Sequence, residues 1–260
     1  MNRSLKIILV TFFSFGVYFI LDELYFATLR TWLNQTINQI GISHLITYVI
    51  MGTPLFIGTI LLHGRTKLFD SLGLNGSPLE GFVFALICTL PMFIGFAFLF
   101  DFNADISLNR IVLAVIAAGF FEELYFRGFL FGMLFRFSRL GYILSVLVGA
   151  LLFGSVHIYQ GSEFNQIVGI FMVTFMGGIL FAWVYSEWNY NLWVPIFLHM
   201  LMNLSWELFS VSTNALGGSY SNIFRGITIA LVIILTLRYK RKKGKALEVN
   251  KSTLIIKPKA

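Results

Sequence analysis

The stretch from Ile111 to Phe135, IVLAVIAAGFFEELYFRGFLFGMLF, decides how the rest of the chain is interpreted. Its length and apolar character are those of a membrane-spanning helix, which needs about 20 mainly apolar residues. Its centre, however, holds Glu122, Glu123 and Arg127. A charged side chain at the centre of a bilayer costs about 2.5–3.5 kcal/mol on insertion scales, so the three charges require partners, water or a chemical task. We therefore expect the function of the protein to depend on this stretch.

The composition is that of a membrane protein. Of the 260 residues, 57% are hydrophobic and only 12% are charged, whereas soluble domains carry about 25% charged residues. We expect an all-α polytopic membrane protein with about eight transmembrane helices, none of them obviously broken, around an intramembrane catalytic cavity. We place these spans at residues 5–26, 42–62, 81–100, 111–135, 141–159, 166–185, 192–209 and 223–237.

The domain organisation follows from these spans. Residues 1–245 are expected to form a single integral-membrane domain, and its motif-bearing core covers residues 109–211. Residues 246–260 are expected to form a basic C-terminal tail. No segment is left for a separate soluble domain, because apolar runs with short polar breaks occupy nearly the whole chain.

The distribution of charge predicts topology. A net charge of +7 could suggest nucleic-acid binding, but much of the excess follows the last apolar run directly. With eight spans both termini lie on one side, and the positive-inside rule makes that side cytoplasmic, most simply at the cell membrane. Fifteen of the 19 lysines and arginines then lie on the cytoplasmic side: Arg3, Lys6, Arg65, Lys67, Arg136, Arg139 and the nine from Arg238 onward.

The charges on the fourth predicted span suggest two roles. Glu123 and Arg127 are four residues apart, so on a helix they face each other and can form an ion pair. Glu122 points about 100° away from Glu123, which leaves it free to enter a water-accessible cavity as a general base. The alternative, a buried charge cluster without chemistry, leaves this carboxylate with no obvious basic partner.

Two later spans offer partners for Glu122. Phe153 and His157 are four residues apart on the fifth span, and His199 and Asn203 are four apart on the seventh. At about 1.5 Å per residue, Glu122 and His199 lie near mid-depth, while His157 comes out closer to the outer face. Two histidines, an amide and a free carboxylate on three spans favour convergence on one cavity.

The three motifs Glu122-Glu123-x-x-x-Arg127, Phe153-x-x-x-His157 and His199-x-x-x-Asn203 resemble those of the CAAX prenyl protease and bacteriocin-processing (CPBP, Abi) family of intramembrane proteases. The resemblance covers roughly residues 111–209. It implies an endopeptidase that hydrolyses a peptide bond in a membrane-associated substrate, either a prenylated protein or a leader-type peptide. The expected partners are therefore membrane lipid and such a peptide or lipidated protein, with no nucleic acid.

The resemblance also implies a role for each motif residue. Glu122 would activate a water with help from His157, and His199 and Asn203 would stabilise the oxyanion of the tetrahedral intermediate. Glu123 and Arg127 would support the site. In this interpretation no cofactor is required. The alternative is a metalloprotease, in which Glu122, His157 and His199 hold a zinc ion and a water takes the fourth position.

Two other functions compete with proteolysis. Intramembrane carboxylates and histidines also mark proton-coupled transporters, although the sequence shows neither an inverted repeat nor an obviously broken helix. The second competing function is that of a catalytically silent scaffold of the same fold. The intact motifs argue against it. Glu207 continues the His199–Asn203 face, and we expect it to be solvated at the end of its span. The alternative is that Glu207 serves as a second acid near the cavity mouth.

Overall fold

The computed structural model describes residues 2–256, and that part of the chain is built from helices joined by short loops. The all-α prediction is therefore confirmed. Among the described residues, an isolated antiparallel β-bridge joins Leu140 and Ile256. The elements are α1 (Arg3–Ile37), α2 (Ile40–Met51), α3 (Thr53–His63), η1 (Arg65–Lys67), α4 (Leu68–Ser71), α5 (Pro78–Leu99), α6 (Leu108–Ile111), η2 (Val112–Phe131), η3 (Met133–Phe137), α7 (Tyr142–Ser155), η4 (Ile158–Gln160), α8 (Phe164–Glu187), α9 (Trp193–Leu208) and α10 (Ser219–Lys242).

Every predicted span lies on one or more of these helices. In the described part of the chain, five helices are long and apolar enough to cross a membrane, and there are six such segments if the bent pair α2–α3 is one span. The helix η2 carries three charged residues and α9 has only 16 residues, so neither is among them. The protein is a multi-pass membrane protein, and the number eight stays a prediction.

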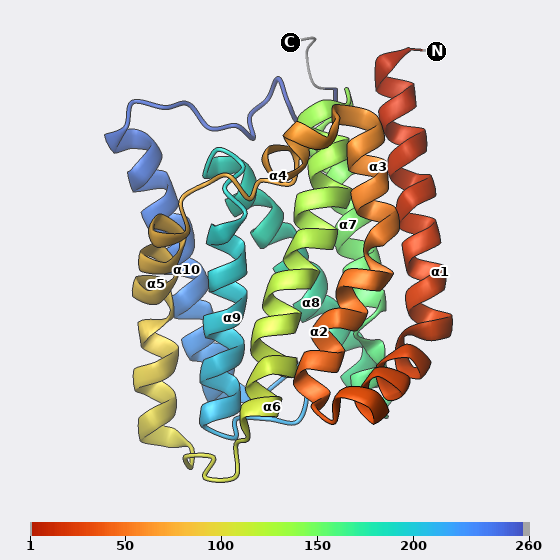
Figure 1. Ribbon diagram of the computed structural model, residues 1–260. Helices are drawn as coiled ribbons and strands as arrows, with labels where there is room; N and C mark the ends of the chain where they lie inside the picture. The colour runs from red at the N-terminus through yellow and green to blue at the C-terminus, as the bar shows by residue number, and fades with distance from the viewer. Residues whose placement is uncertain (1, 257–260) are drawn as a thin grey trace.

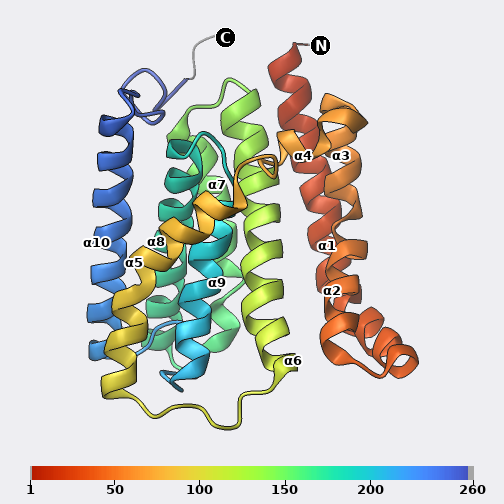
Figure 2. The same ribbon diagram turned by 60° about the vertical axis from the view of Figure 1, so that its left-hand side comes forward.

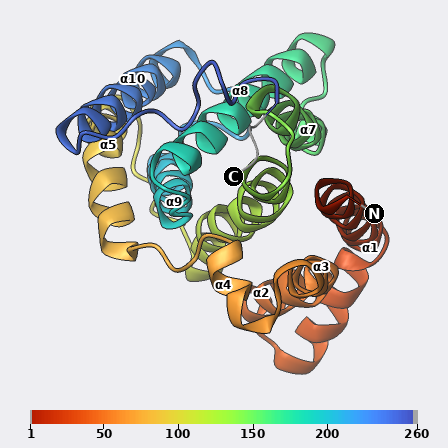
Figure 3. The same ribbon diagram turned by 90° about the horizontal axis from the view of Figure 1, so that it is seen from above.

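The helices form a bundle with α9 and η2 at its centre (Figure 1). The helix α9 packs against α5 on one side and η2 on the other, and α10 covers α5. The helices α1, α2 and α3 form a group beyond η2, which Figure 2 shows apart from α5 and α10. The view from above shows α7 and α8 closing the remaining side (Figure 3). The beginning of α1 and the end of α10 lie at the same end of the bundle (Figure 1).

One predicted span is not straight. The segment expected to cross the membrane at residues 42–62 is divided into α2 and α3, which are bent by 41° at Gly52. Proline at the start of α3 explains the break, because Pro54 has no amide hydrogen for the ladder of the preceding turn. The expectation of no broken helix is therefore wrong at this point.

The helix η2 contains π-type turns. Its backbone bonds reach five residues back, as in the bond from the Gly132 amide to the Arg127 carbonyl. Such π-type turns are uncommon and frequently accompany functional sites. The helix is fixed laterally by its aromatic side chains, among them Tyr125, whose hydroxyl donates to the Tyr48 carbonyl at 2.6 Å. The helix that carries Glu122, Glu123 and Arg127 is therefore firmly held.

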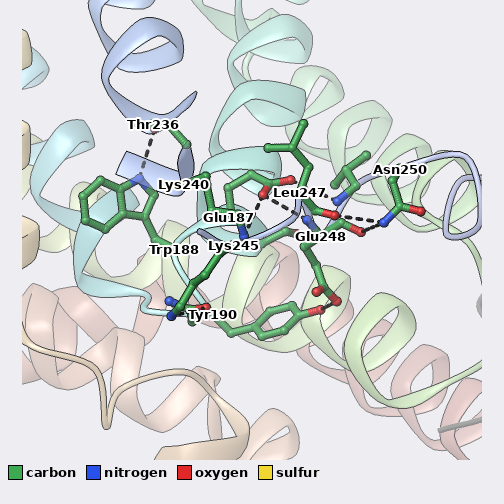
Figure 4. A network of polar contacts seen from close by, with 12 residues as sticks. Glu187, Trp188, Tyr190, Thr236, Lys240, Lys245, Leu247, Glu248 and Asn250 are labelled. Atoms are coloured by element: carbon green, nitrogen blue, oxygen red, sulfur yellow. Dashed lines mark hydrogen bonds and ion pairs between the residues drawn. The ribbon is translucent and has the colours of Figure 1, made fainter. Parts of the chain in front are cut away.

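The chain after α10 packs against the bundle. Glu187, at the end of α8, is fully buried and accepts from Lys240 Nζ at 3.0 Å. Its two oxygens also accept the backbone amides of Glu248 at 3.0 Å and Val249 at 2.9 Å (Figure 4). The side chain of Tyr190 donates to Glu248. Residues 246–256 of the predicted tail are thus part of the fold, and residues 257–260 lie outside the described residues.

The last described residues also cap a helix. The amides of Gly141, Tyr142 and Ile143, at the start of α7, donate to the carbonyls of Ile255, Thr253 and Leu254 at 3.1, 2.8 and 3.0 Å. The first amides of a helix have no acceptor within the helix, so these carbonyls supply the missing hydrogen-bond acceptors of α7. Glycine is required at 141, because a Cβ there would lie 2.3 Å from the Ile255 carbonyl carbon.

Candidate active site

The two adjacent glutamates of η2 differ in their surroundings. The side chain of Glu123 is fully buried, whereas that of Glu122 is 20% exposed. This difference agrees with the divergence of neighbouring side chains on a helix. Glu122 faces a cavity that α7, α8, α9 and α10 also line. The structure therefore separates the pair as the sequence predicted.

Glu123 and Arg127 form the predicted ion pair. Arg127 Nη1 lies 3.1 Å from Glu123 Oε1, and both side chains are almost completely buried. The guanidinium also lies over the ring of Phe153 at 4.1 Å and near that of Phe181 at 5.5 Å. Cation–π contacts strengthen when they are shielded from water. The pair thus connects η2 to α7 and α8.

His157 reaches Glu122 because α7 ends early. The helix stops at Ser155, and His157 lies in the turn that follows. Its Nδ1 contacts the Phe153 carbonyl at 2.7 Å. A carbonyl can only accept, so Nδ1 carries the hydrogen and neutral His157 has a lone pair on Nε2. That Nε2 lies 3.8 Å from Glu122 Oε2. The side chains of His157 and Glu122 thus meet at one level of the bundle, although a straight helix places His157 nearer the outer face.

His199 contacts both glutamates. Its Nδ1 lies 2.8 Å from Glu123 Oε1 and its Nε2 lies 3.9 Å from Glu122 Oε2. The close approach of η2 to α9 requires glycine at 119, because a Cβ there would lie 3.0 Å from the Met200 backbone nitrogen. Glu123 therefore has a task that the sequence did not predict, which is to orient His199.

The orientation of His199 bears on its predicted role. With Nδ1–H donating to Glu123, a neutral His199 presents a lone pair at Nε2 and can only accept there. It becomes a donor towards the cavity only when Nε2 also carries a hydrogen. The two histidines thus flank Glu122 in the same way, each with Nδ1 fixed by an acceptor outside the cavity.

Asn203 lies on the cavity wall and is anchored to η2. Its Nδ2 donates to the Ala114 carbonyl at 2.8 Å. An amide nitrogen has two hydrogens, so one remains for a ligand. The structure therefore brings Glu122, His157, His199 and Asn203 to one cavity, as predicted.

The cavity has a volume of about 1240 Å³ and an uneven lining. Apolar side chains of α8, among them Met172, Met176 and Leu180, form much of its wall. The end beside the loop between α9 and α10 is polar and includes Asn214 and Asn222. A volume of this size fits a peptide segment or a lipid chain, because drug-sized ligands occupy about 300–1,000 Å³.

Glu207 is not the solvated residue that we expected. It lines the cavity, its side chain is 16% exposed, and it binds Arg110 through both oxygens at 2.8 Å. The hydrogen bonds that Arg110 donates to Glu207 raise the pKa of its guanidinium. The sequence missed this pair because its members are 97 residues apart. The available sequence signal for this pair was that Arg110 and Glu207 lie at the ends of neighbouring spans.

The metal alternative involves Glu122 Oε2 and the Nε2 atoms of the two histidines. Each histidine has its Nδ1 held by an oxygen, as metal-bound histidines usually do, and Glu122 Oε2 is buried without a hydrogen-bond partner. The two Nε2 atoms lie 3.8 and 3.9 Å from Glu122 Oε2. These separations are wide for atoms that each bind the same zinc ion at a metal–ligand distance of about 2.0–2.2 Å. Within residues 2–256, no group of three such side chains is placed to hold a metal ion.

These features define a class: a multi-pass helical membrane protein with a buried carboxylate between two histidines at a large cavity. Comparison with protein families narrows this class. Residues 104–205 match the family described as Rce1-like, type II CAAX prenyl endopeptidase Rce1-like. The match includes all three motifs and confirms the resemblance found in the sequence. It supports a membrane protease as the class of enzyme. Searches of curated proteins and of solved structures each gave no match.

Proposed function

We propose that this protein is an intramembrane endopeptidase that hydrolyses a peptide bond in a membrane-associated peptide or lipidated protein, with Glu122 as the general base. The observation that carries the proposal is the position of Glu122 Oε2, which is buried, has no hydrogen-bond partner and lies 3.8 and 3.9 Å from the Nε2 atoms of His157 and His199. Separations above about 3.5 Å between polar groups suit a bridging water. A water held there is next to both a base and two imidazoles.

The proposed reaction begins with proton transfer from this water to Glu122, while the oxygen attacks the peptide carbonyl. His157 Nε2 accepts a hydrogen bond from the water and orients it. Negative charge then develops on the carbonyl oxygen, and protonated His199 and the second Asn203 hydrogen donate to it. Glu122 returns the proton to the leaving amine. Glu123 and Arg127 act by holding His199 and η2 in position.

A metalloprotease remains the alternative mechanism, with Glu122, His157 and His199 as the residues that would hold zinc. A metal would supply Lewis-acid activation of water when bound. The positions of the three side chains would have to contract for that purpose. Addition of a chelator to the active protein distinguishes the two mechanisms.

The test is hydrolysis of quenched fluorescent peptides, with and without a farnesyl cysteine, by purified protein in liposomes. We expect wild type to cleave at least one peptide class and Glu122→Gln to lose at least about 1000-fold, because the amide cannot take the proton. Its thermal unfolding temperature should stay close to that of wild type. The matched control is Glu207→Gln, which removes another carboxylate from the same cavity and should retain cleavage within a few-fold.

Full proteolysis by Glu122→Gln would exclude the mechanism. Cleavage lost on addition of a chelator and restored by zinc would favour the metalloprotease. Proton flux into liposomes without cleavage of any peptide would favour the transporter, for which the bend between α2 and α3 is one favourable feature. Neither cleavage nor flux would favour the silent scaffold. The cytoplasmic location of both termini is a further proposal, and protease protection of tags at each end tests it.

A further inference from the structure

The helix α2 contributes to the cavity wall although it carries none of the three motifs. Its Tyr48 lines the same cavity as Glu122 and lies outside residues 104–205, which match the family. Within residues 2–256, Tyr48 forms hydrogen bonds through its backbone, and none involves its hydroxyl. The phenol is therefore a hydrogen-bond donor at the cavity that the fold itself does not use.

The ring of Tyr48 is held in place by its neighbours. It stacks on Phe121 with ring centres 4.8 Å apart and planes 7° from parallel. Phe26 and His44 contact it edge-on at 4.9 and 5.0 Å. The Tyr48 carbonyl also accepts the hydrogen bond from the Tyr125 hydroxyl. The hydroxyl is thus presented by a ring that packing fixes on several sides, as a preorganised donor requires.

The Tyr48 hydroxyl lies next to the reacting groups. Phe121 directly precedes Glu122 in η2, so the stacked rings bring Tyr48 to the level of Glu122. The Glu122 carboxylate is the charged group that acts most strongly on this hydroxyl, followed by Asp22 of α1. Both α2 and α9 pack against η2, and Figure 3 shows them on different sides of that helix. Tyr48 therefore approaches the site from a helix that supplies neither histidine.

The motif residues alone offer few donors to a developing negative charge. Both histidines have Nδ1 fixed by an acceptor, so in their neutral forms each Nε2 can only accept. Asn203 retains one hydrogen after its bond to the Ala114 carbonyl. A phenol keeps its hydrogen at neutral pH. Tyr48 is thus a second donor that does not depend on the protonation of His199.

We propose that the Tyr48 hydroxyl donates a hydrogen bond to the oxyanion of the tetrahedral intermediate, which makes α2 part of the active site. This inference rests on the proposed function. The phenol keeps its proton throughout and forms no covalent bond with the substrate. Its contribution is electrostatic, because a fixed dipole directed at the oxyanion stabilises the transition state more than the bound substrate.

The first experiment measures cleavage kinetics in liposomes with the peptide that wild type cleaves fastest. Tyr48→Phe keeps the ring and its packing and removes only the hydroxyl. We expect kcat to fall about 100-fold, as for other single oxyanion donors, while KM stays close to that of wild type. The matched control is Tyr159→Phe, which removes a phenol hydroxyl from a mostly exposed ring of the same cavity and should keep kcat within a few-fold.

The second experiment measures binding in detergent, with a chelator present. The probe is an apolar hexapeptide whose central peptide bond is replaced by a phosphinic group, a stable tetrahedral anion. The comparison peptide carries an uncharged ketomethylene group at the same place. Tyr48→Phe should lose about tenfold or more of the preference for the phosphinic peptide, because a hydrogen bond to a charged group is worth at least that. Affinity for the ketomethylene peptide should stay the same, and Tyr159→Phe should keep the preference.

The two experiments distinguish this inference from the proposed function. Cleavage by wild type together with an unchanged kcat in Tyr48→Phe, or with a change in KM alone, leaves the protease and overturns the inference. An equal loss in Tyr159→Phe also overturns it. A Tyr48-dependent preference for the phosphinic peptide without any cleavage keeps the donor and removes the protease. The ketomethylene peptide reports the folded fraction of each variant, so the ratio of the two affinities is independent of stability.

Discussion

The protein buries acidic side chains in two regions, and the two are satisfied to different degrees. Glu187, at the end of α8, uses both oxygens: one Lys240 amine and two backbone amides bind it. At the centre of the bundle, Glu122 Oε2 and Glu123 Oε2 are buried without hydrogen-bond partners. A fully satisfied polar network makes a structure rigid, whereas unsatisfied buried groups need a separate explanation. The first region holds the fold together, and the second faces a cavity and is available for chemistry.

The contrast extends to what each region connects. The Glu187 network links α8 and α10 to residues 248–249, and its components are saturated. The Glu122 region links η2 to α7 through His157 and to α9 through His199, and its face towards the cavity stays open. Buried charge is therefore not by itself a sign of a catalytic site in this protein. The unused hydrogen-bonding capacity next to a cavity is the better indicator.

Loss of the Glu187 carboxylate should have the largest effect on stability. Glu187→Ala leaves the buried Lys240 amine unpaired and two backbone amides without acceptors, which should lower the free energy of unfolding by about 3–5 kcal/mol. Unfolding in detergent measures this. Cleavage per folded molecule should stay close to wild type. The exposed Glu163→Ala, at the other end of α8, is the control and should change little. A decrease below about 1 kcal/mol would contradict the structural role of this region.

Glu123→Ala should have a smaller effect on stability and a large one on activity. The free energy of unfolding should decrease by about 1–3 kcal/mol, because Arg127 loses its carboxylate but keeps the Phe153 ring at 4.1 Å. Cleavage should be lost as well, since His199 loses the acceptor that orients it. A double-mutant cycle with Arg127→Ala measures the pairing, and the double variant should lose less than the sum of the single ones. Strict additivity would show that the two side chains do not support each other.

Tyr190→Phe should have the smallest effect, about 0.5–1.5 kcal/mol. Burial, together with the bond to Glu248, raises the pKa of Tyr190, so the phenol remains a donor at neutral pH. Its loss removes one hydrogen bond from the region around Glu187 and leaves the ion pair with Lys240 intact. The exposed Tyr220→Phe is the matched control. A decrease as large as that of Glu187→Ala would mean that the network acts as one unit.

Much of the architecture could be predicted from the sequence, because in a membrane the apolar runs themselves determine the helices. The ion pair between Glu123 and Arg127 was also predictable, since both residues lie on one helix and their spacing fixes their relation. The convergence of Glu122, His157, His199 and Asn203 on one cavity followed from their chemistry. Contacts between helices were harder to obtain from spacing alone.

Three features could not be obtained from the sequence, each for a physical reason. The bond between Glu123 and His199 depends on how η2 and α9 are rotated against each other, which spacing within one helix does not determine. The position of His157 depends on α7 ending at Ser155. The place of Arg225 in the cavity lining depends on how the first turns of α10 pack, which hydropathy alone does not show.

The cap on α7 implies an order of assembly. The carbonyls that receive the first amides of α7 belong to residues 253–255, which the ribosome adds nearly a hundred residues after the helix ends at Ser155. The α7 segment is therefore synthesised well before the residues that satisfy its first amides. Termination before residue 253 would leave every predicted span in place and yet leave α7 without its cap.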